Sequence, residues 1–102
     1  MISFSLRRTL FSPESELARV AGLTIPSWDA IPAADLLRAV DYYDDAVFNR
    51  YQLDALVAEI HHWLAYEADR GDPEGRREKI LELEPVLRGR SRSGGYAVFL
   101  GE

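Results

Sequence analysis

Both ends of this 102-residue chain carry the pattern of a β-strand, and this feature constrains the fold more than any other. At the start, Ile2, Phe4 and Leu6 alternate with polar side chains, the period of two expected of a strand with one buried face. The apolar segment 96–100 closes the chain. Two such strands invite pairing in one small antiparallel sheet. Because a two-stranded sheet is marginal alone, helices must cover its apolar face.

Between these ends the sequence predicts about four helices. Ser12–Pro13 and Asp72–Pro73 each place a capping side chain before a proline that suits the first helical turn, and Pro32 opens another helix. Asn49 and Gln52 form a variant of the capping box at the start of the longest helix. The four predicted helices cover about 13–21, about 32–43, 49–71, and 72 onward.

Shorter features complete the expected fold. Pro85 either kinks the last helix or stops it near Glu84, because its ring removes a donor and displaces an earlier carbonyl. Val47 and Phe48 form a possible third short strand, and residues 88–95 are typical of a flexible basic loop. We therefore expect a single α+β domain spanning all 102 residues, in which a small antiparallel sheet pairs the N- and C-terminal strands and is covered by about four helices.

The residue inventory opposes catalysis and metal binding. The chain has no cysteine, which excludes thiolate nucleophiles and cysteine-bound zinc, and it has neither a Gly-x-Ser-x-Gly elbow nor a phosphate-binding loop. Glu59 and His62 have the Glu-x-x-His spacing of a metal pair, but di-iron bundles need two such pairs. We interpret His61 and His62 as lying on the shoulder of an amphipathic helix. No enzyme activity, cofactor or metal is expected.

Acidic residues are concentrated in the middle of the chain. The net charge is −5, yet between Trp28 and Glu74 eleven acidic side chains face three arginines, which gives −8 there and +3 for the two flanks together. Phosphate contacts need cations, so this balance opposes nucleic-acid binding and suits a basic protein partner. No apolar run approaches the roughly 20 residues that span a bilayer, and no leader pattern opens the chain. We expect no membrane association and, by default, a cytoplasmic location.

Two neighbouring tyrosines flanked by aspartates form the strongest candidate for a binding surface. Tyrosine gives a large, rigid contact area, and clustered carboxylates steer and select a basic partner. In the alternative interpretation, Tyr42 or Tyr43 packs inward and the aspartates only cap the loop before Val47. The predicted partner-binding residues are Asp41, Tyr42, Tyr43, Asp44, Asp45 and Asp54.

A second, weaker candidate is basic. Five arginines would come together if the terminal strands pair, and they could bind phosphate or an acidic helix. Without interleaved aromatic residues, a solvated loop is the simpler interpretation. These residues are Arg7, Arg8, Arg88, Arg90 and Arg92.

The segment 43–53, YDDAVFNRYQL, resembles a segment of small acidic actinobacterial proteins that also tend to end in a short aromatic strand. This resemblance implies a shared fold and brings no established activity. In binding mode alone, Tyr42 and Tyr43 between Asp41 and Asp44 are similar to the paired tyrosines of immunity proteins, small acidic helical proteins that bind basic nuclease toxins. The similarity implies a toxin-neutralising immunity protein acting by occlusion. The alternative is a small regulatory or accessory subunit that acts through homo- or hetero-oligomerisation.

Overall fold

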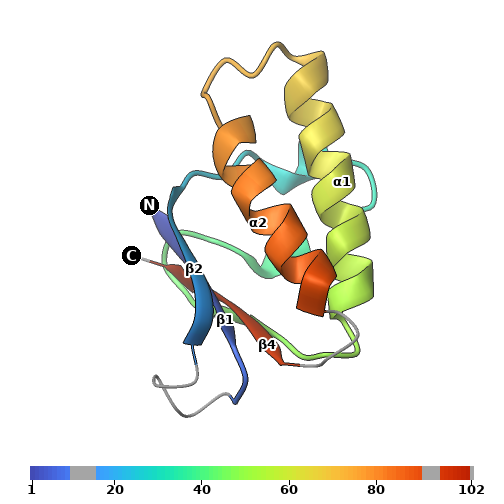
Figure 1. Ribbon diagram of the computed structural model, residues 1–102. Helices are drawn as coiled ribbons and strands as arrows, with labels where there is room; N and C mark the ends of the chain where they lie inside the picture. Colours follow the sequence, from blue (N-terminus) through green and yellow to red (C-terminus); the bar gives the residue numbers. More distant parts are fainter. Residues whose placement is uncertain (10–15, 91–94, 102) are drawn as a thin grey trace.

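The computed structural model describes residues 1–9, 16–90 and 95–101, in which four strands form one antiparallel sheet and two α-helices cover one of its faces (Figure 1). β1 (Ile2–Arg7) and β4 (Tyr96–Gly101) pair at the centre of the sheet, whose strand order is β2-β1-β4-β3. The α+β class and the pairing of the two terminal strands are therefore confirmed. The other elements are β2 (Glu16–Leu23), β3 (Ala46–Phe48), α1 (Leu53–Asp69) and α2 (Arg77–Arg90).

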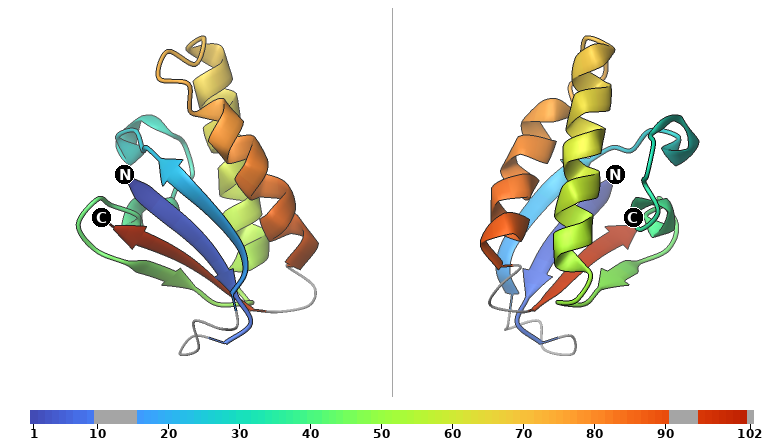
Figure 2. Two further views of the ribbon diagram at one scale, coloured as in Figure 1. Left: turned by 60° about the vertical axis from the view of Figure 1, so that its left-hand side comes forward. Right: turned by 90° about the vertical axis from the view of Figure 1, so that its right-hand side faces the viewer.

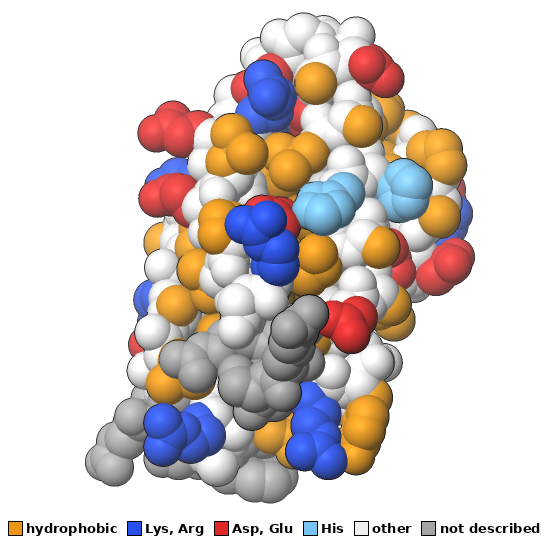
Figure 3. Space-filling view, turned by 45° about the vertical axis from the view of Figure 1, so that its right-hand side comes forward, with side chains coloured by type: hydrophobic (Ala, Val, Ile, Leu, Met, Phe, Trp, Pro, Cys, Tyr) orange, Lys and Arg blue, Asp and Glu red, His pale blue; other side chains and the backbone are white. Residues whose placement is uncertain are grey.

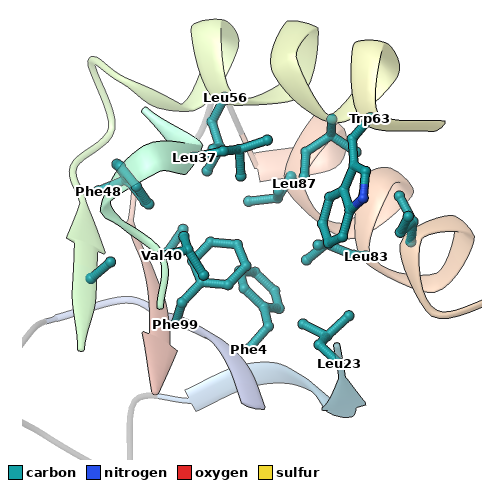
Figure 4. Close-up of a cluster of buried hydrophobic side chains, with 14 of the residues drawn as sticks. Phe4, Leu23, Leu37, Val40, Phe48, Leu56, Trp63, Leu83, Leu87 and Phe99 are labelled. Carbon is teal, nitrogen blue, oxygen red and sulfur yellow. The ribbon is translucent and has the colours of Figure 1, made fainter. Parts of the chain in front are cut away.

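The core lies between the sheet and the two helices, as Figure 4 shows. Phe4 of β1 faces Phe99 of β4 across the ladder, with the ring centroids 5.2 Å apart, and Phe48 of β3 lies edge-on to Phe99 at 6.0 Å. Large buried side chains from the helices pack over these rings. Those labelled in the figure are Leu56 and Trp63 from α1 and Leu83 and Leu87 from α2. Burial of this continuous apolar cluster is the main favourable contribution to folding.

Among the described residues, no helix lies on the other face of the sheet (Figure 2), where polar side chains of β1 and β2 contact one another. Ser5 is fully buried there: its hydroxyl donates to Glu16 Oε1 at 2.6 Å and accepts from Arg7 Nε at 3.1 Å. Arg19 lies 3.7 Å from the same carboxylate oxygen. Buried polar groups need hydrogen-bond partners. These contacts supply them to the buried hydroxyl of Ser5, on the face of the sheet that carries no helix.

The helix expected over about 13–21 is wrong wherever the structure describes that segment, because β2 occupies it; its first residues lie outside the described ranges. Val20 and Leu23 are buried against the core because β2 pairs with β1. Gly22, with a φ of +79°, accommodates a register shift between them. Tertiary pairing thus overrides the helical propensity of a segment rich in Glu, Leu and Ala.

The helix expected over about 32–43 is also wrong. This part of the chain is irregular apart from one short 3-10 turn, Leu37–Ala39, and a second such turn, Trp28–Ala30, precedes it. The buried carboxylate of Glu59 in α1 accepts the backbone N–H groups of Leu36 and of the next residue, each at 2.9 Å. Those donors therefore bond to a side chain rather than to a preceding helical turn. The described residues contain two α-helices instead of about four.

The longest predicted helix is confirmed as α1, but it begins at Leu53 rather than at Asn49, and its N-cap residue Gln52 makes no side-chain hydrogen bond to the first turn. The expected contacts between Asn49 and Gln52 lie in the turn before the helix. Gln52 Oε1 accepts the N–H of Asn49 at 2.9 Å, which is half of the predicted capping box. The other half is displaced by one residue, because the N–H of Tyr51 donates to Asn49 Oδ1 at 2.9 Å. At the far end, Gly71 has a φ of +78°, the left-handed conformation that commonly ends a helix.

The last predicted helix is confirmed as α2, but it does not stop near its proline. The helix begins at Arg77 and not at Asp72–Pro73 as predicted, although Asp72 Oδ1 accepts the N–H groups of Arg76 and Arg77 at 2.9 and 3.2 Å at its start. Pro85 lies inside the helix with its ring exposed. The buried Leu83 and Leu87, on either side of it, hold the helix on the core. Packing of this apolar face therefore outweighs the loss of one backbone hydrogen bond.

Candidate functional site

Exposed apolar side chains gather around one edge of the sheet. Five large apolar residues are exposed in the described part of the chain, and three of them lie within or beside β3: Tyr43 (91% exposed), Val47 (44%) and Tyr51 (79%). β3 pairs with β4 on one side only and forms the outer edge of the sheet (Figure 2). Because three of the exposed apolar side chains belong to one stretch of nine residues, this segment is the candidate for an interaction site. We call the residues 43–51 together with Asp54 the β3 surface.

Asp41 shapes the start of this surface. Its Oδ1 accepts the backbone N–H of Tyr43 at 2.6 Å and that of Asp44 at 2.8 Å, an aspartate turn that projects the Tyr43 ring into solvent. The carboxylate of Asp41 is therefore used within the chain. Its role is to position Tyr43 and Asp44.

Tyr42 does not share the exposure of its neighbour. The ring is half-buried and packs against the core, and its hydroxyl oxygen accepts the backbone N–H of Ile25 at 2.8 Å. The alternative interpretation, in which one of the two tyrosines packs inward, therefore describes Tyr42, whereas Tyr43 faces solvent. Tyr42 thus anchors the segment on the domain, and Tyr43 projects into solvent.

Asp44 and Asp45 keep the chain beside β4 beyond the three residues of β3. Asp45 Oδ1 accepts the N–H of Gly101 at 3.1 Å. A Cβ built on Gly101 would lie 2.9 Å from both the backbone N and the backbone O of Asp44. The aspartate segment is thus pressed against the end of β4, where glycine allows this close approach.

Replacing Gly101 by alanine is expected to lower the free energy of unfolding by about 1–3 kcal/mol, because the new methyl group meets rigid backbone. Urea unfolding measures this change. Gly89→Ala in α2 is the matched control: its Cβ meets nothing within 4 Å, so that variant should be unchanged or slightly stabilised. Equal unfolding midpoints for Gly101→Ala and the wild type would contradict the close contact.

On the other side of β3, Arg50 and Tyr51 form a pair. Arg50 Nη2 donates to Tyr51 Oη at 2.7 Å, and its guanidinium carbon lies 4.8 Å from the ring centroid. This hydrogen bond and the charge interaction with Tyr51 raise the pKa of Arg50, and Tyr96 of β4 adds to the effect. Asp54 follows, exposed in the first turn of α1. The side chains of Asp44 and Asp54 make no hydrogen bond or ion pair with a described residue.

The histidine pair lies elsewhere, on the helical face shown in Figure 3. His61 Nε2 lies 3.0 Å from Glu84 Oε1 of α2, and both His61 and His62 are exposed. Glu59 is buried and bonded to backbone, so it does not act with His62 as a metal pair. Within 1–9, 16–90 and 95–101, no three His, Asp or Glu side chains are grouped to hold a metal ion.

The basic candidate is divided by the structure. Arg7 is engaged with Ser5, and Arg88 lies 3.5 Å from Glu84 within α2. Arg8 is exposed. The basic loop was expected over residues 88–95. Helix α2 extends through residue 90, so the first part of that range is helical. Residues 91–94, including Arg92, lie outside the described residues.

Sequence reasoning missed a buried ion pair. Glu67 of α1 is fully buried, and Arg76 Nη1 lies 3.1 Å from its Oε1. Arg76 also donates to Thr24 Oγ1 and to the carbonyl of Ile25, both at 3.1 Å, and Trp63 Nε1 donates to Glu67 Oε1 at 3.3 Å. The sequence carried one sign of this pair: Glu67 falls at the helical spacing of the apolar stripe, on the face of the helix that packs on the core. This pair joins α1 to the segment that Tyr42 also anchors.

No helix in the described part of the chain is long and apolar enough to cross a membrane. Comparison with protein-family models, curated proteins and solved structures gives no match. Arguments about function therefore rest on the geometry of the β3 surface.

Proposed function

We propose that this protein is a non-enzymatic binding protein that neutralises a basic protein partner by occlusion, as an immunity protein neutralises a toxin. The observation that carries the proposal is the gathering of exposed Tyr43, Val47 and Tyr51 at a free sheet edge, beside carboxylates with no partner among the described residues. Exposed aromatic rings with apolar neighbours supply contact area when a partner excludes water from them.

Charge favours a basic partner for this surface. The stretch from residue 41 to residue 54 carries a net charge of −3, because it contains one cation, Arg50, and four aspartates: Asp41, Asp44, Asp45 and Asp54. Carboxylates at the rim of an interface accelerate encounter with lysines and arginines and reject acidic competitors. Asp44 and Asp54 are the best placed for this role, because Asp41 and Asp45 already accept backbone hydrogen bonds.

Within this proposal the two tyrosines have separate roles. Tyr43 inserts into the partner, whereas Tyr42 holds the segment on the domain through Ile25. The predicted binding residues therefore include positioning residues, Asp41 and Tyr42, alongside those that contact the partner.

Replacing Tyr43 by alanine should weaken capture of the partner by about tenfold or more, the usual effect of truncating an aromatic hot spot. The unfolding midpoint should stay the same, because the ring is almost fully exposed. Immobilised wild type and variant would be incubated with lysate of the native cell, and the captured proteins quantified by mass spectrometry. Leu81→Ala, which truncates an exposed apolar side chain on α2, is the control and should retain capture. Capture of the same proteins in equal amounts by Tyr43→Ala would count against the proposal.

The free edge of β3 favours a second candidate function, that of a small accessory subunit acting through oligomerisation. β3 has a neighbouring strand on one side only among the described elements, and an unpaired edge is a template for another chain. In this second case the edge of β3 would bind a strand of another chain, rather than the folded surface of a basic protein.

A further inference from the structure

The backbone of Ile25 is held from both sides by side chains that are far from it in the sequence. Its N–H donates to the hydroxyl oxygen of Tyr42 at 2.8 Å, and its carbonyl accepts from Arg76 Nη2 at 3.1 Å. The same guanidinium donates through Nε to Thr24 Oγ1 at 3.1 Å. Residues 24 and 25 follow β2 and belong to no helix or strand, so side chains supply the partners that a ladder would otherwise provide.

Arg76 is a rigid base for these contacts. Its side chain is only 12% exposed, and its Nη1 lies 3.1 Å from the fully buried carboxylate of Glu67. Its backbone is fixed as well, because its N–H donates to Asp72 Oδ1 and its carbonyl accepts the N–H of Ile80 in α2. A guanidinium carries its donors in fixed directions in one plane, so one side chain binds a carboxylate, a hydroxyl and a carbonyl at once.

Tyr42 connects this cluster to the β3 surface. Its ring packs against the core, and the next residue along the chain is Tyr43, whose side chain is 91% exposed. The contacts therefore form an unbroken series from Glu67, through Arg76 and Ile25, to the start of the β3 surface.

Beyond Tyr43 a different element holds the chain. Asp45 Oδ1 accepts the N–H of Gly101, and the backbone of Asp44 lies against the same glycine at the end of β4. The N–H of Gly101 therefore reports on the β4 side of the segment, whereas the N–H groups of Ile25 and Tyr43 report on the Arg76 side.

We propose that Arg76 is a positioning residue for the β3 surface, acting through the backbone of Ile25 and the hydroxyl of Tyr42. Tyr43 is thereby held in one exposed position before a partner arrives, which reduces the conformational entropy that binding must remove. This role rests on the proposed function for its purpose, whereas the hold on the segment can be tested without any partner.

Arg76→Lys separates positioning from the loss of a buried charge. Lysine keeps a positive charge beside Glu67, but its ammonium lacks the planar set of donors that reaches Thr24 and Ile25 as well. In the purified full chain, amide hydrogen exchange at Ile25 should become about tenfold faster, measured residue by residue by NMR under native conditions.

Other amides distinguish local release from general destabilisation. The Tyr43 amide should accelerate together with that of Ile25, whereas the Gly101 amide and the slowest amides of β1 should change much less. A merely structural role for Arg76 would instead accelerate all slow amides by one common factor, set by the loss of global stability. Tyr42→Phe removes the acceptor of the Ile25 N–H and should reproduce the acceleration at Ile25.

Arg77→Lys is the matched control, because Arg77 is the neighbouring arginine and is exposed; its exchange pattern should equal that of the wild type. A common factor for all slow amides in Arg76→Lys would overturn the proposal, as would an unchanged rate at Ile25. Capture from lysate by the same variants gives a separate result. Arg76→Lys should capture less than Arg77→Lys, and equal capture would count against positioning. If even the wild type captures nothing, the proposed function fails while the exchange rates still decide the role of Arg76.

Discussion

Replacing Arg76 by methionine should lower the free energy of unfolding by about 3–5 kcal/mol, the usual cost of leaving one member of a buried ion pair without its partner. Glu67 has no exposed surface, and Arg76 lies 3.1 Å from it while also bonding to Thr24 and Ile25. The variant therefore retains a carboxylate with no compensating cation. Urea unfolding followed by circular dichroism measures the loss.

Two further variants identify the cause of this loss. Arg77→Met removes an exposed arginine one residue along the chain, so it should cost well under 1 kcal/mol. Glu67→Gln/Arg76→Met neutralises both partners and keeps an acceptor for Trp63, so it should recover much of the stability. If Arg77→Met proved as harmful as Arg76→Met, the buried pair would not be the reason.

Truncating Phe99 to alanine should cost about 3–5 kcal/mol, the range for removing a buried aromatic side chain and leaving a cavity. Phe99 belongs to a central strand and contacts both Phe4 and Phe48, so its truncation leaves a cavity between the rings of the neighbouring strands. Calorimetric or urea unfolding of the purified variant provides the measurement.

Leu100→Ala is the matched control, because Leu100 is the next residue and faces the opposite side of the sheet, where it is only partly buried. It should cost clearly less than Phe99→Ala. A larger loss for Leu100 would mean that the two faces of β4 have been assigned the wrong way round.

The elements predicted correctly from the sequence are those whose local pattern and tertiary role agree. The alternation around Phe4 predicts a strand and the apolar stripe of α1 predicts a helix, and these are the elements found in the fold. Residues 16–23 carry helix-favouring side chains, and only the edge offered by β1 makes them a strand. Likewise, Glu59 acts on Leu36 from 23 residues away in sequence, a distance that no local pattern reports.

The sequence pattern pointed to the segment 41–54, but which of its side chains reach the surface could not be predicted from it. Two adjacent tyrosines look alike in sequence, and the difference between them arises from Asp41 turning the chain and from Ile25 bonding to Tyr42. Val47, Arg50 and Tyr51 were missed as surface residues because their exposure follows from β3 being an outer strand. Which strand is outermost depends on where β4 is inserted.

The position of β4 between β1 and β3 bears on how the chain matures. A ribosome releases β1 long before β4, although neither β1 nor β3 has its full set of neighbours until β4 arrives. The nascent polypeptide must therefore keep its phenylalanine-rich layer unfinished, and open to chaperones or to aggregation, until the closing segment leaves the exit tunnel.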